Sequence, residues 1–284
     1  MNYRREIDGL RALAVVPVIL FHAGFEWFSG GFVGVDIFFV ISGYLITSII
    51  LSGKQDGTFT LLRFYERRAR RILPVLFFIM LACLPFAWLW MPPHEMVEFS
   101  RSLIAVPLFV SNILFWRETG YFATANELKP LLHTWSLAVE EQYYLLFPLF
   151  LLLTWKLGRR WIVALLAVMA ILSLVLAQWG SMNSPTASFY LLPTRGWELL
   201  IGALVAFYLS RGIKVENSNK QKAINQAGSL LGVLLIGYAA VTFDKTTPFP
   251  GFYAVIPTLG TAFVILFATP ATMTGRVQIG RAHV

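Results

Sequence analysis

Nine apolar runs follow one another along the chain, and this succession limits the possible folds more than any other feature of the sequence. Of 284 residues, 57% are hydrophobic and only 13% are charged. A soluble domain carries more charged residues than this on its surface. We therefore predict an all-α fold, a polytopic transmembrane helix bundle in which eight or nine of the runs are helices. The runs cover residues 10–28, 34–51, 72–90, 103–116, 137–155, 161–179, 196–209, 228–243 and 252–268.

Lysine and arginine indicate which loops face the cytoplasm. They gather before the first run, between the second and third, between the fifth and sixth, and between the seventh and eighth. All four clusters lie on one side only if the short run 103–116, which contains Pro107, does not cross the membrane. We therefore predict eight full spans and a cytoplasmic N-terminus, with residues 92–136 and 180–195 facing outward. This distribution also accounts for the net charge of +8 without a nucleic-acid partner.

The sequence argues against a cleavable signal peptide and against an internal disulfide. The first apolar run has no small-residue cleavage site and is followed at once by a second, so it is not a cleavable signal peptide. The single cysteine, Cys83, rules out an internal disulfide and is interpreted as a packing residue. No metal site is predicted.

Arg11 and His22 stand inside the first apolar run. Eleven residues advance a helix by about three turns and roughly 16 Å, so the two side chains share one face. The alignment is only approximate, because Pro17 lies between them and is expected to kink the helix. Ionisable side chains at membrane depth are costly and usually functional. The structural alternative is an arginine that reaches the interface and a histidine that is hydrogen-bonded within the bundle.

Carboxylates occur at the outer ends of two other runs. Asp36 begins the second run after Gly30, Gly31 and Gly34, and is predicted at a depth comparable to His22, where it would orient the imidazole. The alternative is a helix N-cap. Glu140 and Glu141 stand inside the fifth run, with one side chain expected to face the interior and the other the interface.

Two further motifs contain arginine. The segment FYERRARRILP places four arginines at the predicted cytoplasmic end of the third run, where either Arg67 with Arg71 or Arg68 with Arg71 can point together and bind phosphates. A positive-inside anchor is the alternative. In FYLLPTRGWELLIGAL, Arg195 and Glu198 are spaced for a local ion pair.

Taken together, these stretches resemble the acyltransferase 3 family of membrane proteins, over about residues 3–270. The family's arginine and histidine, separated by ten residues, match Arg11 and His22, and its arginine pair, separated by two residues, matches Arg68 and Arg71. HTWSLAVEEQYYL and FYLLPTRGWELLIGAL resemble the bacterial subgroup that is fused to a C-terminal extracytoplasmic SGNH domain.

The resemblance implies an O-acyltransferase of the bacterial inner membrane, with acetyl-CoA as cytoplasmic donor and no metal. The implied acceptor is a surface polysaccharide or lipid-linked glycan, such as lipopolysaccharide O-antigen or peptidoglycan. Arg11, Arg68 and Arg71 are then the predicted cofactor-binding residues. His22, Asp36 and Glu141 are the predicted catalytic residues, and Arg195 and Trp135 the predicted substrate-binding residues. His22 acts either as a base on a sugar hydroxyl or as an acyl acceptor.

The chain also departs from the family pattern. About ten helices are expected, so we interpret residues 1–270 as a C-terminally truncated membrane domain without its SGNH partner. Residues 271–284 are interpreted as a non-homologous tail, because the ending VQIGRAHV back-translates into a common sequencing adapter. Two other functional classes remain open at this stage: a transporter or flippase of an acyl or lipid-linked substrate, and a scaffold in which the buried charges are structural.

Overall fold

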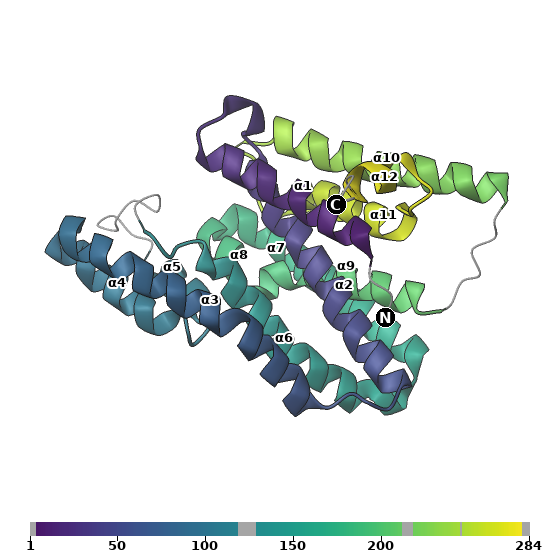
Figure 1. The fold of residues 1–284 in the computed structure, drawn as a ribbon, viewed down its shortest axis with the longest axis horizontal. Helices are drawn as coiled ribbons and strands as arrows, with labels where there is room; N and C mark the ends of the chain where they lie inside the picture. Colours follow the sequence, from purple (N-terminus) through teal and green to yellow (C-terminus); the bar gives the residue numbers. More distant parts are fainter. Residues whose placement is uncertain (1–3, 119–128, 212–217, 245, 280–284) are drawn as a thin grey trace, which may run out of the picture.

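The computed structural model describes residues 4–118, 129–211, 218–244 and 246–279, and within them it contains helices and no strand. The predicted all-α bundle is confirmed (Figure 1). The longer helices are α1 (Arg5–His22), α2 (Gly34–Gln55), α3 (Leu61–Trp90), α4 (Pro93–Ala105), α6 (Thr134–Thr154), α7 (Arg159–Asn183), α9 (Leu192–Leu209), α10 (Asn219–Thr242) and α11 (Val255–Phe267). The shorter ones are η1 (Glu26–Phe28), η2 (Gly31–Val33), α5 (Ser111–Arg117), η4 (Trp155–Leu157), α8 (Pro185–Tyr190), η5 (Phe252–Ala254) and α12 (Met273–Ile279).

Helix α2 is the central element of the bundle. It packs along α9, which in turn packs along α7, while α10 pairs with α11. Its sequence is apolar on nearly every face, and twelve of its residues are buried, as expected for a helix surrounded by other helices. Figure 1 shows α2 passing between α1 and α9, with α3, α4 and α6 forming a layer to one side.

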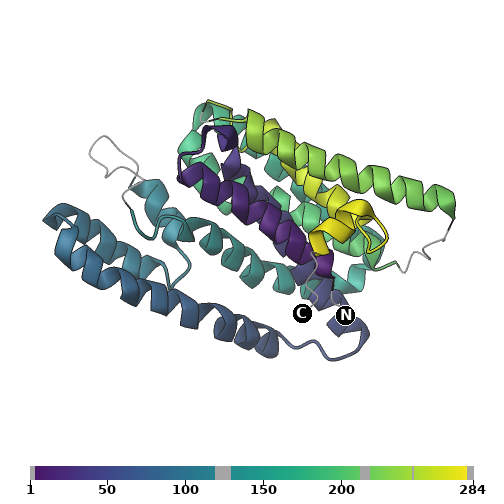
Figure 2. The same cartoon turned by 45° about the horizontal axis from the view of Figure 1, so that its top comes forward.

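One end of the bundle gathers the basic residues. Arg4 donates to the carbonyl groups of Ile265 and Ala268 at the end of α11. Lys54, near the end of α2, lies over the ring of Trp155, and Arg159 at the start of α7 bonds to Ser210 after α9. Figure 2 places the N-terminus and the α2–α3 connection at this same end.

The opposite end gathers the other connections. Ser29, between α1 and α2, donates to the carbonyl oxygen of Phe243 after α10. The side chain of Gln178 in α7 accepts from the backbone N–H of Phe252 before α11. The helices α1, α2, α7, α9, α10 and α11 therefore run between the same two ends, as the predicted alternation of basic and non-basic loops requires.

Five helical segments in the described residues are long and apolar enough to cross a membrane: Gly31–Gln55, Leu61–Trp90, Thr134–Leu157, Arg159–Asn183 and Asn219–Thr242. Helices α1, α9 and α11 also correspond to predicted runs but are shorter. Run 103–116 is divided between α4 and α5, and Phe109 between them has a positive φ of 54°. Run 103–116 is therefore not one continuous helix, and the prediction that it does not cross the membrane stays a prediction.

Helix α3 is longer than its apolar run. It starts at Leu61 instead of residue 72, because the arginine-rich segment before the run also consists of good helix formers. Of the predicted tail, residues 273–279 form α12, whereas 280–284 lie outside the described residues. The non-homologous origin of that tail stays a prediction.

Glycine allows α2 and α9 to approach closely. A Cβ atom at Gly43 would collide with the carbonyl oxygen of Leu199, and one at Gly202 with that of Val40. The backbone of α9 at Leu199 cannot move aside as a flexible side chain could. We therefore expect Gly43→Ala to lower the free energy of unfolding by about 1–3 kcal/mol. Gly237 on α10 has open space around it, so Gly237→Ala is the control. Thermal unfolding in detergent compares the two, and equal melting temperatures would contradict the packing described here.

Candidate active site in the membrane helices

His22 is the last residue of α1 and its side chain is exposed. Its Nδ1 atom lies 2.8 Å from the carbonyl oxygen of Val18, one turn earlier. A carbonyl oxygen only accepts, so Nδ1 carries the proton in this contact, and Nε2 of the neutral ring is then unprotonated. This arrangement leaves a basic and nucleophilic nitrogen available at the surface of the helix.

A second histidine, His133, interacts electrostatically with His22. His133 stands directly before α6, and its pKa is lowered from the ordinary histidine value. Neighbouring protein atoms partly desolvate its ring, and His22 is near enough to disfavour a second positive charge.

Arg68 on α3 is held by two side chains of α6, Glu141 and Tyr144. Its Nη2 atom lies 2.6 Å from Oε1 of Glu141, and its guanidinium carbon lies 3.9 Å from the centre of the Tyr144 ring. Tyr144 in turn donates to Glu140 over 3.0 Å. The guanidinium group is thus fixed by an ion pair on its edge and an aromatic ring on its face.

This contact lies within the span of α6. Glu141 is seven residues after Thr134, so it lies roughly 10 Å along the helix from its first residue. Tyr65 of α3 bonds to the carbonyl oxygen of Leu145, which confirms the antiparallel register of the two helices. Because α3 is offset along α6, Arg68 lies within the span of α6 although it precedes the apolar run of its own helix. Its position at the cytoplasmic end of that run stays a prediction.

The other two predicted cofactor-binding arginines lie outside this cluster. Arg71 is exposed on α3, and Arg11 on α1 forms an ion pair with Asp8 at 3.0 Å. The exposed pair between Arg70 and Glu66, at 2.7 Å, occupies another face of α3. Binding of a cofactor by these arginines stays a prediction.

Asp36, Arg195 and Glu198 form a separate cluster that is fully buried. Arg195 lies 3.2 Å from a carboxylate oxygen of Asp36 and 3.2 Å from one of Glu198. All three side chains have no exposed surface. The expected Arg195–Glu198 pair is thus present, and it is joined by a residue far away in the sequence.

Aromatic rings enclose this cluster. The guanidinium carbon of Arg195 lies 5.2 to 5.9 Å from the ring centres of Phe39, Trp135, Phe189 and Phe249. Desolvated cation–π contacts of this kind offset part of the cost of burying a charge. Two predicted substrate-binding residues, Arg195 and Trp135, therefore meet each other in the protein core, where neither presents an open face to a substrate.

The predicted contact between Asp36 and His22 is wrong. Asp36 faces Arg195, and the backbone carbonyl of Val18 is the group that orients His22. Local helix geometry accounts for this outcome, since a side chain in the last turn of a helix can bond to a carbonyl oxygen one turn earlier. The catalytic roles of His22, Asp36 and Glu141 stay predictions.

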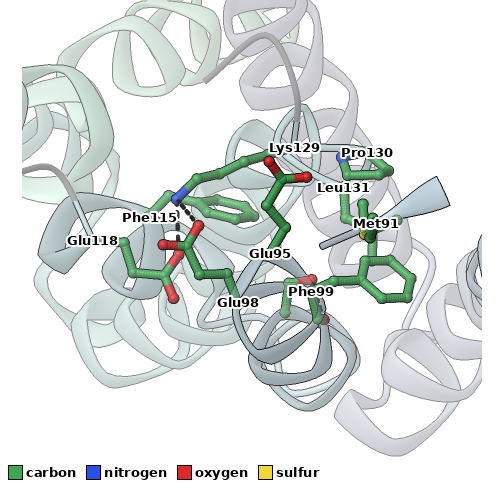
Figure 3. A pocket seen from close by; sticks show the side chains of 10 residues that line it. Met91, Glu95, Glu98, Phe99, Phe115, Glu118, Lys129, Pro130 and Leu131 are labelled. Atoms are coloured by element: carbon green, nitrogen blue, oxygen red, sulfur yellow. Dashed lines mark hydrogen bonds and ion pairs between the residues drawn. The ribbon is translucent and has the colours of Figure 1, made fainter. Parts of the chain in front are cut away.

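A fourth polar cluster joins α4, the end of α5 and the chain before α6. Figure 3 shows the Nζ atom of Lys129 between two carboxylates, 3.3 Å from Glu98 and 3.0 Å from Glu118. The cavity beside it measures about 20 Å³, room for about one water molecule. Among the described residues, no group of His, Cys, Asp or Glu has the arrangement of a metal site. We interpret the Lys129 cluster as a connection between short helices.

Comparison with known proteins identifies the family. Residues 4–274 match the family model of acyltransferase 3, described as an acyltransferase domain. The chain belongs to the acyltransferase 3 family. The matched residues include the Arg68 cluster on α3 and α6 and the cluster of Asp36, Arg195 and Glu198 on α2 and α9. They also include His22 and Arg11.

Two relatives illustrate the similarity of this acyltransferase 3 chain to characterised proteins. Peptidoglycan O-acetyltransferase OatA of Listeria monocytogenes is 33% identical over 97% of the chain and 46% of the relative. O-acetyltransferase OatA of Staphylococcus aureus is 37% identical over 72% of the chain and 35% of the relative. The chain thus spans less than half the length of these curated relatives. No solved structure matches it.

Two residues of the Arg68 cluster were not predicted as functional. The sequence patterns assign no role to Glu140 and do not single out Tyr144, although Tyr144 contacts both Arg68 and Glu140. A sequence signal did exist, because Tyr144 follows Glu140 by four residues and Glu141 by three, which places it on the same side of a helix as both.

Proposed function

We propose that this acyltransferase 3 chain is the membrane part of an O-acetyltransferase that moves an acetyl group from acetyl-CoA to a hydroxyl group of a cell-envelope glycan. The match of residues 4–274 to the family carries this proposal. The names of the two relatives support acetyl as the transferred group. Peptidoglycan, in the name of the Listeria relative, supports a cell-wall acceptor ahead of lipopolysaccharide O-antigen.

The geometry of His22 suits the transfer step. Its exposed ring, with Nδ1 bonded to Val18, presents Nε2 to a reactant. In direct transfer, Nε2 takes the proton of the sugar hydroxyl while the sugar oxygen bonds to the acetyl carbon. The carbon–sulfur bond of the donor breaks, and the proton passes to the leaving sulfur to give CoA. In the alternative, Nε2 bonds to the acetyl carbon as the carbon–sulfur bond breaks and CoA leaves as the thiolate; the sugar oxygen then takes the acetyl group from Nε2, and the hydroxyl proton goes to the thiolate.

The arginines suit the donor. We assign to Arg68 the acyl end of acetyl-CoA, because Glu141 and Tyr144 hold its guanidinium group within the span of α6. A fixed guanidinium group can donate to a thioester carbonyl oxygen as negative charge develops there. Arg71 and Arg11, which are less buried, are assigned to the phosphates of the nucleotide.

The orientation follows from charge. Arg4, Lys54 and Arg159 lie at one end of the bundle, which we place in the cytoplasm of a bacterium, where acetyl-CoA is available. His22 then lies toward the outer face of the inner membrane. An SGNH domain in the complete protein is a proposed further partner.

Glu141→Gln tests the donor site. The substitution removes the charge that holds Arg68, so we expect kcat/KM for acetyl-CoA to fall on the order of tenfold, mainly through a higher KM. Glu66→Gln is the matched control, because Glu66 also pairs with an arginine but on the exposed side of α3. Steady-state kinetics with the complete protein measure both, and an unchanged KM in Glu141→Gln would refute the assignment of Arg68.

The acceptor is tested in cells. The complete open reading frame is expressed in a bacterium that lacks its own envelope O-acetyltransferases, with His22→Ala at a matched level as control. Base-released acetate is then measured on purified peptidoglycan and on lipopolysaccharide. We expect acetate on peptidoglycan that depends on His22. Acetate on lipopolysaccharide alone would overturn the peptidoglycan preference, and acetate on neither would overturn transfer to these glycans.

A further inference from the structure

A cavity of about 410 Å³ lies between α6, α7 and α9. Binding sites for small molecules commonly measure roughly 300–1,000 Å³, so the space exceeds an ordinary packing defect. Its walls include Leu146 and Phe150 of α6, Met169 and Leu172 of α7, and Leu200 of α9. It is separate from the ion clusters around Arg68 and Arg195, none of whose charged residues line it.

The side chains that line the cavity favour an apolar occupant. Of the lining residues, only Tyr143 and Ser173 have polar side-chain atoms. Ser173 donates to the carbonyl oxygen of Pro193 over 2.6 Å and accepts from the N–H of Trp197 over 3.1 Å, so it satisfies the first turn of α9. Water in such a space would lack the two to four polar partners that it needs. An apolar occupant therefore suits this space better than water.

The depth of the cavity identifies the source of that occupant. Its lining on α6 begins at Tyr143, nine residues after the helix starts, and ends at Phe150, seven residues before Leu157, the last residue of that span. Both limits lie about 10 Å or more inside the span. At this depth the surrounding medium is the hydrocarbon of the bilayer.

The cavity is continuous with the surface that faces lipid. Leu146, Leu172 and Leu176 line it and are also 56%, 63% and 41% exposed. The lining extends over about 10 Å along each helix, a length that fits part of one chain and not a whole lipid. We propose that this cavity, which is an open groove on the lipid-facing side, binds one acyl chain of a bilayer phospholipid. The acyl chain fills the space between α6 and the α7–α9 pair.

Gly196 offers a way to fill the groove from the protein side. A Cβ atom there would meet Ser173 at 3.8 Å and Leu192 at 3.9 Å, which are ordinary contacts, so a larger side chain has room to extend into the cavity. Gly237 on α10 also has open space but does not line this groove, and Gly237→Leu is the matched control. Leu172→Trp, at the exposed rim, is a second variant that leaves the helix interior untouched.

Photo-crosslinking tests the proposal. The complete protein is reconstituted in phosphatidylglycerol vesicles that contain a phospholipid with a diazirine in the middle of one acyl chain, and labelled peptides are located by mass spectrometry. We expect label concentrated on the groove-lining segments of α6, α7 and α9, lost in Gly196→Leu and Leu172→Trp, and retained in Gly237→Leu.

Three outcomes would overturn it. Label spread evenly over all lipid-facing helices would show that no specific groove site exists. Displacement of the label by polyprenyl phosphate, but not by unlabelled phosphatidylglycerol, would assign the groove to a lipid-linked substrate instead. Exclusion of the probe by a segment of the same protein or by a second copy, detected as a protein–protein crosslink at the groove, would replace the lipid with protein.

Discussion

His22→Ala is expected to lower the rate of acetyl transfer by about 10²–10⁴-fold, the usual contribution of a general base. The side chain has one backbone hydrogen bond, to Val18, and is exposed at the end of α1. Its removal therefore leaves no buried polar group unpaired, and the melting temperature should stay close to that of the wild type. Rates with labelled acetyl-CoA and thermal unfolding in detergent are measured on the same preparations.

A second histidine provides the control for this prediction. His94 at the start of α4 is 70% exposed in its side chain, and the proposed reaction does not use it. His94→Ala should therefore retain both activity and stability. Transfer by His22→Ala near the wild-type rate would refute the assigned role, and a parallel loss of stability and activity would make the residue structural.

Arg195→Met should have the largest effect on stability. The substitution preserves much of the apolar stem but leaves the carboxyl groups of Asp36 and Glu198 buried without their cation. Removal of one partner from a buried ionic cluster costs about 3–5 kcal/mol of unfolding free energy. Denaturation in a titration of mixed detergent micelles measures this change relative to the wild type.

Two further variants make the result specific. Arg70→Met removes an arginine whose side chain is 79% exposed, and it should change stability little. Adding Asp36→Asn and Glu198→Gln to Arg195→Met neutralises the whole cluster and should recover part of the loss. Equal stability of Arg195→Met and Arg70→Met would contradict the burial described here.

Much of the fold could be predicted from the apolar runs and the basic loops. The runs indicated the helices because backbone in a membrane must satisfy its own hydrogen bonds. Proline and shortness marked run 103–116 as an exception, and the chain does break there, near Phe109. The length of α3 was underestimated, since hydrophobicity does not mark a helix that continues beyond its apolar part.

The candidate site was predicted less completely, and the reason is the distance along the sequence between its members. The Arg195–Glu198 pair was predicted because helical spacing determines it. Contacts of Arg68 with Glu141, and of Asp36 with Arg195, depend instead on the register between helices packed side by side. One sequence does not contain that register, so Asp36 was assigned to the wrong partner.

The central claim is acetyl transfer from CoA, and reconstitution tests it most directly. The complete protein is placed in vesicles with its basic end outward, and acetyl-CoA labelled in the acetyl group is added outside, with peptidoglycan fragments enclosed within. We predict labelled ester on the enclosed glycan and release of one CoA thiol for each acetyl group transferred. Movement of an acyl or lipid-linked substrate across the membrane without CoA release would contradict the account and favour a transporter.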